Sequence, residues 1–238
     1  MPVISILIPF RDTGDRKKQF EWLQKRWATE FPEAEVIVES DDGKDPFSKT
    51  MAVNNCYRKA TSDILALVDA DCWVDPKILI KAAEEIRAGN ASWVRPCKTV
   101  YRLTKSFTMK IVASDKKSFP KVDPEKDTER ITPNVGAVTV FSRKQFEAIG
   151  GMDERFRGWG WEDSAFNMVL DKKFGKAQIW DNIVYHFWHP RLRSDTNRPI
   201  WPGQTNTNEK VGKKYSKAKT SRILLDKLIK ENKNRNNI

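Results

Sequence analysis

The stretch "DILALVDADCWVDP", residues 63–76, joins an uninterrupted apolar run to a pair of carboxylates. The run "ILALV" has the composition of a strand that is buried on both faces. Asp69 and Asp71 follow it directly, and Asp75 and Pro76 are typical of the cap and first turn of a helix. The stretch therefore predicts one strand-and-helix unit of an α/β domain, with acidic groups at the carboxyl end of the strand.

Two units of the same kind precede this stretch. "VISILI" (3–8) predicts a buried strand that stops at Pro9, and a helix follows over about residues 15–31. "AEVIVE" (34–39) predicts a second strand, and Ser48 is placed to cap the next helix. Three such units favour a mainly parallel, Rossmann-like central sheet flanked by helices. Ligands bind such sheets beyond the carboxyl ends of the strands.

Acidic side chains follow all three predicted strands. Asp12 follows the first, Asp41 and Asp42 follow the second, and Asp69 and Asp71 follow the third. The turn preference of Asp explains any one of these groups, but three at one sheet edge favour a ligand site. Carboxylates at i and i+2 can direct one oxygen to a divalent cation and another to a ribose or a metal-bound water. An Asp-x-Asp pattern alone occurs in many loops by chance, and its place after a buried strand is what predicts a nucleotide diphosphate site here.

The second half of the chain returns to regular structure after a charged stretch. Residues 99–132 carry little periodicity and predict a surface insertion. "NVGAVTVFSRKQFEAIGG" (134–151) then predicts a strand and a capped helix. The loop "GMDERFRGWGWED" (151–163) places Glu162 and Asp163 at the N-terminus of another helix. The helix dipole favours ionised carboxylates there, and plain capping also accounts for them.

The order of these motifs resembles the GT-A glycosyltransferases, the nucleotide-diphospho-sugar transferase fold. The resemblance is carried by "SILIPFRD", "EVIVESDDG", "ILALVDADCWVDP", "NVGAVTVFSRKQFEAIGGMDERFRGWGWEDSAF" and "YHFWH", which span about residues 3–190. The later segments are similar to the β-1,4-galactosyltransferases and polypeptide N-acetylgalactosaminyltransferases. In these, a Gly-Trp-Gly-Gly-Glu-Asp or Trp-Gly-Gly-Glu-Asn stretch forms the floor between the donor and acceptor sites. The resemblance implies a hexosyltransferase.

The resemblance implies acceptor-side roles for "GWGWED". Trp159 and Gly160 would shape the acceptor pocket. Glu162 and Asp163 would be the catalytic carboxylates, the first binding acceptor hydroxyls and the second acting as base. Trp161 stands where the family usually has glycine, so we expect its indole to narrow the acceptor pocket or to form a different floor for it. Aspartate rather than asparagine at 163 favours transfer with inversion, because inversion needs a base for the attacking hydroxyl.

The metal-binding residues come from two segments. The resemblance implies that Asp71 is the principal metal ligand, with Asp69 closer to the ribose or to a metal-bound water. "YHFWH" places His186 and His189 at the i, i+3 spacing with which the family completes its metal shell. A single histidine beside aromatic residues is more often a packed core residue, but these are the only two in the chain. Imidazole ligands favour Mn²⁺ over Mg²⁺, and His189 is the better candidate of the two.

The resemblance specifies the residues that bind the donor less closely than those that bind the metal. Uridine diphosphate is the commonest donor carrier of this group, so a UDP-sugar is expected, with Asp41 or Asp42 accepting from the uracil ring. Gly136 would let the donor approach the backbone, although a glycine before a strand needs no such reason. The expected donor contacts are Pro9, Phe10, Arg11, Asp41, Asp42, Asn54, Asp69, Asp71 and Gly136.

Length and charge limit the domain organisation. A chain of 238 residues with 39% apolar content can bury the core of one α/β domain. The C-terminal part from residue 191 has thirteen Lys and Arg against four Asp and Glu, which is +9 of the net charge of +11. Its first part is expected to be a lid over the donor, and "TSRILLDKLIKEN" (220–232) a helix. We expect one catalytic domain at 1–190 and a basic extension at 191–238. The domain is expected to consist of a donor half at 1–98, a variable insertion at 99–132, and an acceptor and metal half at 133–190.

Membrane and secretion signals are not expected in this chain. The first strand begins at residue 3, which leaves no room for a secretory signal, and nowhere do eighteen apolar residues follow one another. The three cysteines show no metal-binding spacing and are too few for a disulfide framework. We therefore expect a cytoplasmic protein, in the host cytoplasm if it is phage-encoded. The sequence gives no indication of the oligomeric state.

The acceptor is open between several hypotheses. A basic extension attracts nucleic acid, acidic polysaccharide or an anionic membrane, and a solvated face is the plain alternative. Nine tryptophans could stack on or displace a base, which favours a phage-type enzyme that adds sugar to 5-hydroxymethylpyrimidine in DNA. The first alternative is a cytosolic transferase acting on glycans or polysaccharides, the commoner acceptor class of this fold. An alternative from another class is a non-catalytic GT-A domain that binds nucleic acid.

Overall fold

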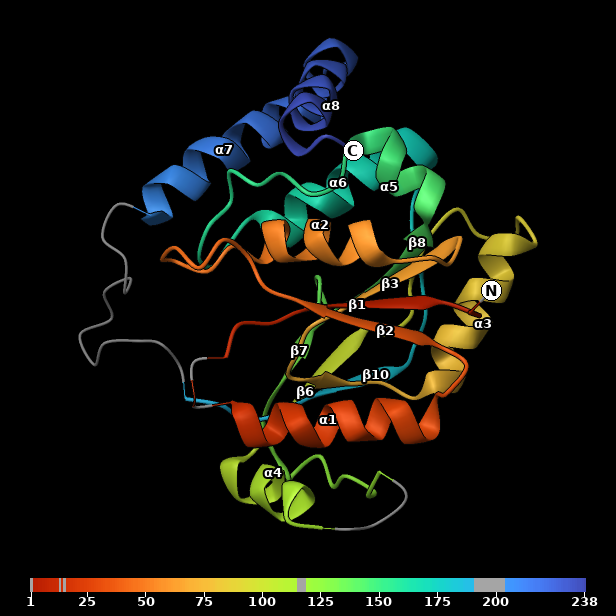
Figure 1. Ribbon diagram of the computed structural model, residues 1–238, viewed down its shortest axis with the longest axis vertical. Coiled ribbons are helices and arrows are strands. Elements are labelled where there is room, and N and C mark those ends of the chain that lie inside the picture. Colours follow the sequence, from red (N-terminus) through yellow and green to blue (C-terminus); the bar gives the residue numbers. More distant parts are fainter. Residues whose placement is uncertain (1, 13, 15, 115–118, 191–203) are drawn as a thin grey trace.

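The computed structural model describes residues 2–12, 14, 16–114, 119–190 and 204–238 (Figure 1). They form a mixed α/β structure with helices on both faces of a six-stranded sheet, which confirms the expected fold class. The main sheet has the strand order β2 (Glu35–Glu39), β1 (Ser5–Pro9), β3 (Ile64–Val68), β8 (Val138–Ser142), β5 (Val94–Arg95) and β9 (Gln178–Ile179).

The strands of the main sheet are parallel where the sequence predicts the nucleotide site. β1 runs parallel to both β2 and β3, whereas β8 is antiparallel to β3 and β5. β9 pairs parallel with β5. Because β1, β2 and β3 all end at one edge, the acidic loops that follow them converge there.

The core has two parts, one on each face of the main sheet. Along β3, Ile64, Ala66 and Val68 join one cluster and Leu65 and Leu67 the other, since successive side chains point to opposite faces. This double burial explains the uninterrupted apolar run in the sequence. The first cluster includes α1 (Lys17–Glu30) and α3 (Pro76–Arg87), and the second includes α2 (Lys49–Lys59), α5 (Arg143–Ile149) and α6 (Glu162–Phe174).

The helix caps expected from the sequence are present. The Ser48 side chain accepts a hydrogen bond from the Met51 N–H at the start of α2, and Asp75 accepts from the Lys77 N–H at the start of α3. α5 begins with a capping box and ends at Gly150, whose φ of 74° lies in the left-handed region that glycine tolerates. These caps fix the positions at which α2 and α3 leave the acidic edge.

A second sheet of four strands takes two of its strands from the predicted surface insertion at 99–132. These two strands, β6 and β7, pair antiparallel with α4 between them, so the stretch contains regular elements that its weak periodicity did not indicate. All side chains of β7 are exposed or half-buried, so the strand lacks the alternation of apolar and polar residues that would have predicted it. The sheet has the order β4 (Cys72–Trp73), β10 (Ile183–His186), β6 (Thr99–Leu103) and β7 (Thr128–Pro133), with α4 at Lys105–Val112.

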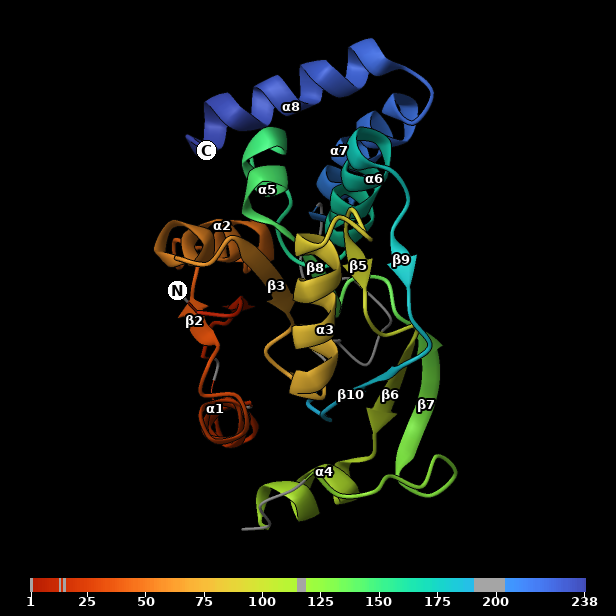
Figure 2. The same ribbon diagram turned by 90° about the vertical axis from the view of Figure 1, so that its right-hand side faces the viewer.

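The C-terminal helices belong to the body of the molecule. α7 (Gln204–Ala218) packs on α6, and α8 (Arg222–Asn236) packs on α5 and α7 (Figure 2). α8 confirms the helix expected at 220–232. The lid expected after His189 falls at 191–203, outside the described residues, and from residue 204 its remainder is helical. None of the described helices is long and apolar enough to cross a membrane.

Candidate active site

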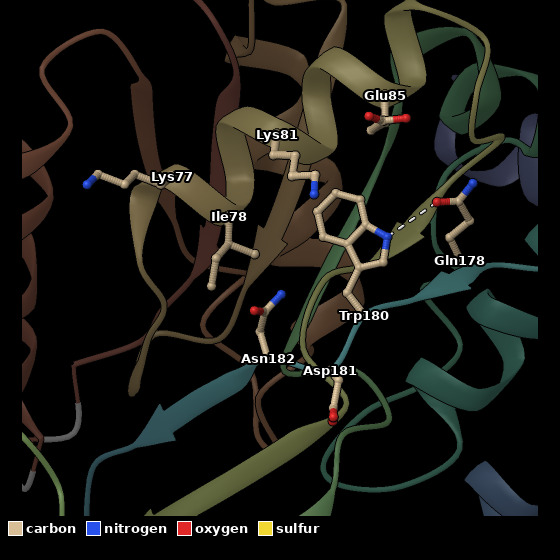
Figure 3. Close-up of a pocket in the computed structure, with 8 residues that line it drawn as sticks. All are labelled: Lys77, Ile78, Lys81, Glu85, Gln178, Trp180, Asp181 and Asn182. Atoms are coloured by element: carbon tan, nitrogen blue, oxygen red, sulfur yellow. Dashed lines mark hydrogen bonds between the residues drawn. The ribbon is translucent and has the colours of Figure 1, made fainter.

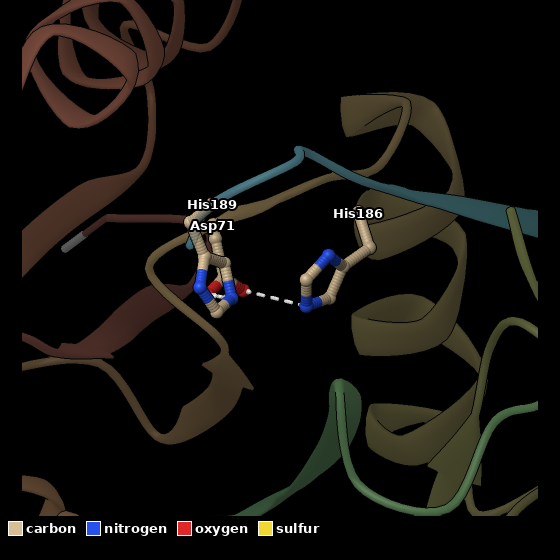
Figure 4. Close-up of side chains that lie close together, drawn as sticks. All are labelled: Asp71, His186 and His189. Atoms are coloured by element: carbon tan, nitrogen blue, oxygen red, sulfur yellow. Dashed lines mark ion pairs between the residues drawn. The ribbon is translucent and has the colours of Figure 1, made fainter. Parts of the chain in front are cut away.

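Asp71, His186 and His189 lie together at the acidic edge (Figure 4). Asp71 occupies the turn between β3 and β4, and β10 pairs with β4 so that His186 lies beside Cys72. The Nε2 atom of His186 is 3.5 Å from Asp71 Oδ1, and that of His189 is 3.2 Å from Asp71 Oδ2. Segments more than a hundred residues apart thus supply one carboxylate and two imidazoles, as the sequence predicts.

This group has the chemistry of a divalent metal site. One ligand atom from each of the three side chains lies within 4.8 Å of the others. Burial raises the pKa of Asp71, but His186, His189 and the Arg16 guanidinium at 3.2 Å hold it well below its usual value. Burial lowers the pKa of His186, whereas at His189 burial is outweighed by the hydrogen bond to Asp71 and its charge, which together raise the pKa. A metal ion would bind the neutral form of either imidazole. Mixed carboxylate and imidazole ligands suit Mn²⁺, so the residues present fit the expected ion.

A second charged group lies around Lys49, the first residue of α2. The Lys49 ammonium is 2.6 Å from Asp69 Oδ1 and 2.8 Å from Asp163 Oδ1, and the side chain is largely buried. Sequence reasoning did not single out this residue. Its position could have indicated a role, because an ammonium group in the first turn of a helix lies at the positive end of the helix dipole. It is unfavourable there unless carboxylates lie nearby.

Burial and mutual repulsion change the pKa values of this group. Burial lowers the pKa of Lys49, but Asp163, Asp69 and Glu162 together raise it well above its usual value. Burial, with repulsion from Asp163, raises the pKa of Glu162 to about 7, and burial likewise raises that of Asp69 to about 6. The Glu162 residue is 7% exposed, and its Oε2 has no hydrogen-bond partner among the described residues. A buried carboxyl oxygen left unpaired is available to a ligand.

Gly136 makes room for the Asp163 carboxylate. A Cβ atom built on Gly136 would lie 2.1 Å from Asp163 Cγ and 2.4 Å from its Cβ. The residue stands in the turn before β8, and glycine is required there by the close approach of Asp163. The expected approach of the donor to this backbone stays a prediction.

The loop before α6 presents Trp159 to solvent. Its side chain is 91% exposed, whereas Trp161 is 41% exposed and has a φ of 77°. The Trp161 indole lies against Gly212 of α7, where an added Cβ would come within 2.4 Å of the ring. Trp159 is therefore free to act as a platform, and the expected narrowing of the pocket by Trp161 stays a prediction.

The predicted donor contacts divide into two groups. The Asp41 side chain is fully buried, with its oxygens bound by the Arg11 guanidinium and the Ser48 N–H. Asp42 lies nearer the surface and pairs with Arg157 at 2.7 Å, which holds the Asp42 pKa at about 2. Asp41 and Arg11 thus shape the loop after β2, while Asp42 keeps solvent access.

Three further residues that were predicted to contact the donor have packing roles in the structure. Phe10 stacks on Phe20 at 3.8 Å between ring centroids, directly after the buried Pro9. Asn54 is fully buried, and its amide bonds both the N–H and the carbonyl of Met152. These bonds assign Asn54 to the support of the loop at 150–157 and give no support to its expected contact with the donor.

Arg102 is a cation beside the histidines that sequence reasoning also missed. It pairs in register with His186 on one side and with Arg130 on the other. Cross-strand partners share a face of the sheet, so His186, Arg102 and Arg130 form a row across three strands that leads away from Asp71. Arg102 Nε is buried and has no acceptor among the described residues. An arginine in this setting suits a phosphate or carboxylate of a substrate.

The pocket drawn in Figure 3 lies apart from this site. It has a volume of about 590 Å³ and lies between α3 and residues 178–182, with the Lys81 ammonium 5.3 Å from the centre of the Trp180 ring. None of the residues predicted to bind donor, acceptor or metal lines it. We therefore place the candidate active site at the carboxyl edge of β1, β2 and β3.

Comparison with solved structures shows the fold that this chain shares with known proteins. The catalytic domain of Drosophila β1,4-galactosyltransferase 7, solved with xylobiose, matches 87% of this chain and 79% of its own at 16% identity, with a TM-score of 0.51. TarS 1–349 of S. aureus, solved with UDP, matches 92% of this chain and 71% of its own at 12% identity, with a TM-score of 0.50. The fold is that of the GT-A glycosyltransferases.

Sequence comparison gives the family. The model of glycosyl transferase family 2 matches residues 27–150, so the chain belongs to this family. A second model, described as the N-terminal domain of galactosyltransferase, matches residues 116–190. A "Probable glycosyltransferase" of Sulfolobus acidocaldarius is 24% identical over 65% of this chain. The aligned part spans only 40% of that archaeal protein.

The raised pKa of Glu162 predicts that the folded protein becomes less stable as the pH rises. The folded protein keeps this proton to about pH 7, whereas the unfolded chain loses it near 4.5. Folded molecules therefore bind more protons in this window, and stability decreases as the pH rises through it. Glu162→Gln is expected to melt at least about 3 °C above the wild type at pH 8 and close to it at pH 5. The exposed Glu129→Gln is the control for thermal melting, and equal melting temperatures at pH 8 would contradict the assignment.

Proposed function

We propose that this protein transfers a sugar from a UDP-sugar to a hydroxyl of a polyanionic acceptor, with inversion and with the help of a divalent cation. The observation that carries the proposal is the placement of two charged groups side by side. Asp71, His186 and His189 form one, and Lys49 with Asp69 and Asp163 forms the other. Asp69 and Asp71 are two residues apart, so the two groups lie in one site. One group can stabilise the departing diphosphate while the other deprotonates the attacking hydroxyl.

Asp163 is the proposed base. Its carboxylate accepts the proton of the acceptor hydroxyl while the oxygen attacks the anomeric carbon, and the bond from that carbon to the diphosphate breaks with its electron pair on the phosphate. The Lys49 ammonium, 2.8 Å from Asp163 Oδ1, holds this carboxylate in position. Glu162, with its unpaired oxygen, binds an acceptor hydroxyl and orients it.

Asp71, His186 and His189 would hold the cation, Mn²⁺ by the character of the ligands. When bound, this ion supplies positive charge to the departing diphosphate. Asp69 lies nearer the ribose side in the proposed arrangement, with Lys49 holding its carboxylate in place. Uridine diphosphate is supported by the fold relative TarS, which was solved with UDP.

The acceptor proposed from the surface charge is DNA that carries 5-hydroxymethylpyrimidine. Residues 204–238, which include α7 and α8, carry ten Lys and Arg against three acidic residues, and α7 contacts the loop at 157–161 that carries Trp159. Trp159 projects beside this basic surface and can stack on an extruded base. Arg102 provides a further cation for a phosphate.

Mass spectrometry of digested nucleosides tests this function. Duplex DNA with 5-hydroxymethylcytosine is incubated with the protein, Mn²⁺ and UDP-sugars, and unmodified duplex is the control. A hexose or acetylhexosamine increment on the modified base alone is the expected result. UDP-sugar hydrolysis without an increment would overturn the DNA acceptor and favour a glycan, to be tested with oligosaccharides. DNA binding without hydrolysis of any donor would overturn the enzymatic proposal in favour of a binding domain.

A further inference from the structure

The first turns of α7 hold the loop that carries Trp159. Asn208 is 1% exposed, and its side chain makes three hydrogen bonds to this loop. Its Oδ1 accepts from the Arg157 N–H at 3.2 Å, and its Nδ2 donates to the carbonyls of Arg157 at 2.8 Å and Gly160 at 3.2 Å. A buried amide that bonds the backbone on both sides of Trp159 fixes the position at which this residue emerges.

Gly212 lies one turn further along the same face of α7. The Trp161 indole packs against it so closely that a Cβ at this position would be 2.4 Å from Cδ2 and Cε3 of the ring. Trp161 precedes α6 with a φ of 77°, which a tryptophan adopts only where its surroundings hold it. The absent side chain at residue 212 therefore permits the conformation that starts α6 at Glu162.

α7 is itself anchored from its other end. The Tyr215 hydroxyl donates to Asp153 at 2.8 Å and accepts from Asn232 of α8 at 3.0 Å. Asp153 also binds Arg155 and Arg235, so the loop at 150–157 and both C-terminal helices share one buried network. The two helices thus hold the loop along its length, from its start after α5 to the residues that precede α6.

We propose that Asn208 and Gly212 are positioning residues for acceptor binding, and that α7 is thereby part of the acceptor site. They act through Trp159, Trp161 and Glu162 and touch neither donor nor metal-binding residues. The inference rests on the proposed function, since it assigns these residues to the acceptor side of glycosyl transfer. It extends that function by giving the basic C-terminal helices a structural task besides electrostatic attraction.

Hydrogen exchange and kinetics of Asn208→Ala provide the first test, with the exposed Ser216→Ala of α7 as control. Amides of residues 157–161 are expected to exchange at least about tenfold faster, because Asn208 no longer holds them. The KM for hydroxymethylated duplex should rise about tenfold or more, while UDP affinity by calorimetry stays unchanged. Unchanged exchange, or an equal loss of UDP affinity, would overturn the inference.

A double-mutant cycle between Gly212 and Trp161 provides the second test. Alanine favours a helix more than glycine does, so Gly212→Ala should stabilise α7 unless it collides with Trp161. We expect Gly212→Ala to lower the melting temperature in the wild-type background and to raise it in a Trp161→Ala background. The same sign in both backgrounds would refute the contact. This cycle and the exchange measurement need no substrate, so their outcome does not depend on whether DNA is the acceptor.

Discussion

Asp163→Asn is expected to lower sugar transfer by about 10²- to 10⁴-fold, the usual contribution of a general base. The amide keeps the size of the side chain and its contact with Gly136, but it cannot accept the proton of the attacking hydroxyl. Lys49 retains its second partner, Asp69, so the site keeps a counter-ion. UDP affinity and the melting temperature should therefore stay near those of the wild type, as calorimetry and thermal melting would show.

Ser164→Ala, one residue further along α6 and exposed, is the matched control and should transfer sugar at the wild-type rate. A loss of less than about tenfold in Asp163→Asn would remove Asp163 from the role of base. The anomeric configuration of the product, measured by NMR, gives a separate check. A product that retains the donor's configuration is incompatible with the single displacement proposed here.

Gly136→Ala is expected to reduce transfer by about a hundredfold or more, because its methyl group would occupy the place of the Asp163 carboxylate. Both Cβ and Cγ of Asp163 lie within 2.4 Å of the added atom, so a rotation of the carboxylate alone does not relieve the overlap. The start of α6 or the turn at Gly136 must therefore shift, which displaces the Asp163 carboxylate from its place beside Lys49. Steady-state kinetics with the donor saturating would measure the loss as a decrease in kcat.

Val135→Ala tests the same turn without this collision. Val135 is 50% exposed and precedes Gly136, so its truncation should leave kcat unchanged. Wild-type kcat in Gly136→Ala would mean that the Asp163 carboxylate does not act from the position seen in the structure.

The sequence was sufficient for the first half of the fold. The apolar run before Asp69 and the caps at Ser48 and Asp75 are local signals, and local signals set element type and ends. The second sheet was missed because β7 is an exposed edge strand and because the strands on the other side of β6, β10 and β4, come from distant segments. A strand without a buried face, such as β7, has no alternation of apolar and polar residues, so a single sequence does not indicate that it pairs with other strands.

The site was predictable where a motif carried it. The spacing and the family resemblance predicted that Asp71, His186 and His189 lie together, and the structure brings them together, while their role as metal ligands stays a prediction. Lys49 and Asn208 were missed because their roles depend on distant residues.

Gly136 was noticed for its missing side chain, but the close neighbour in the structure is Asp163. Contacts of this kind arise from tertiary packing, which periodicity and motifs do not report.

Calorimetric titration of UDP, with and without Mn²⁺, tests the proposed metal and nucleotide site most directly. The wild type is expected to bind UDP tightly only when Mn²⁺ is present. Asp71→Ala is expected to lose this dependence, and His189→Ala to weaken it, with thermal melting as the check that both variants fold. UDP binding of equal strength with and without Mn²⁺, unaffected by either substitution, would contradict the assignment of this site.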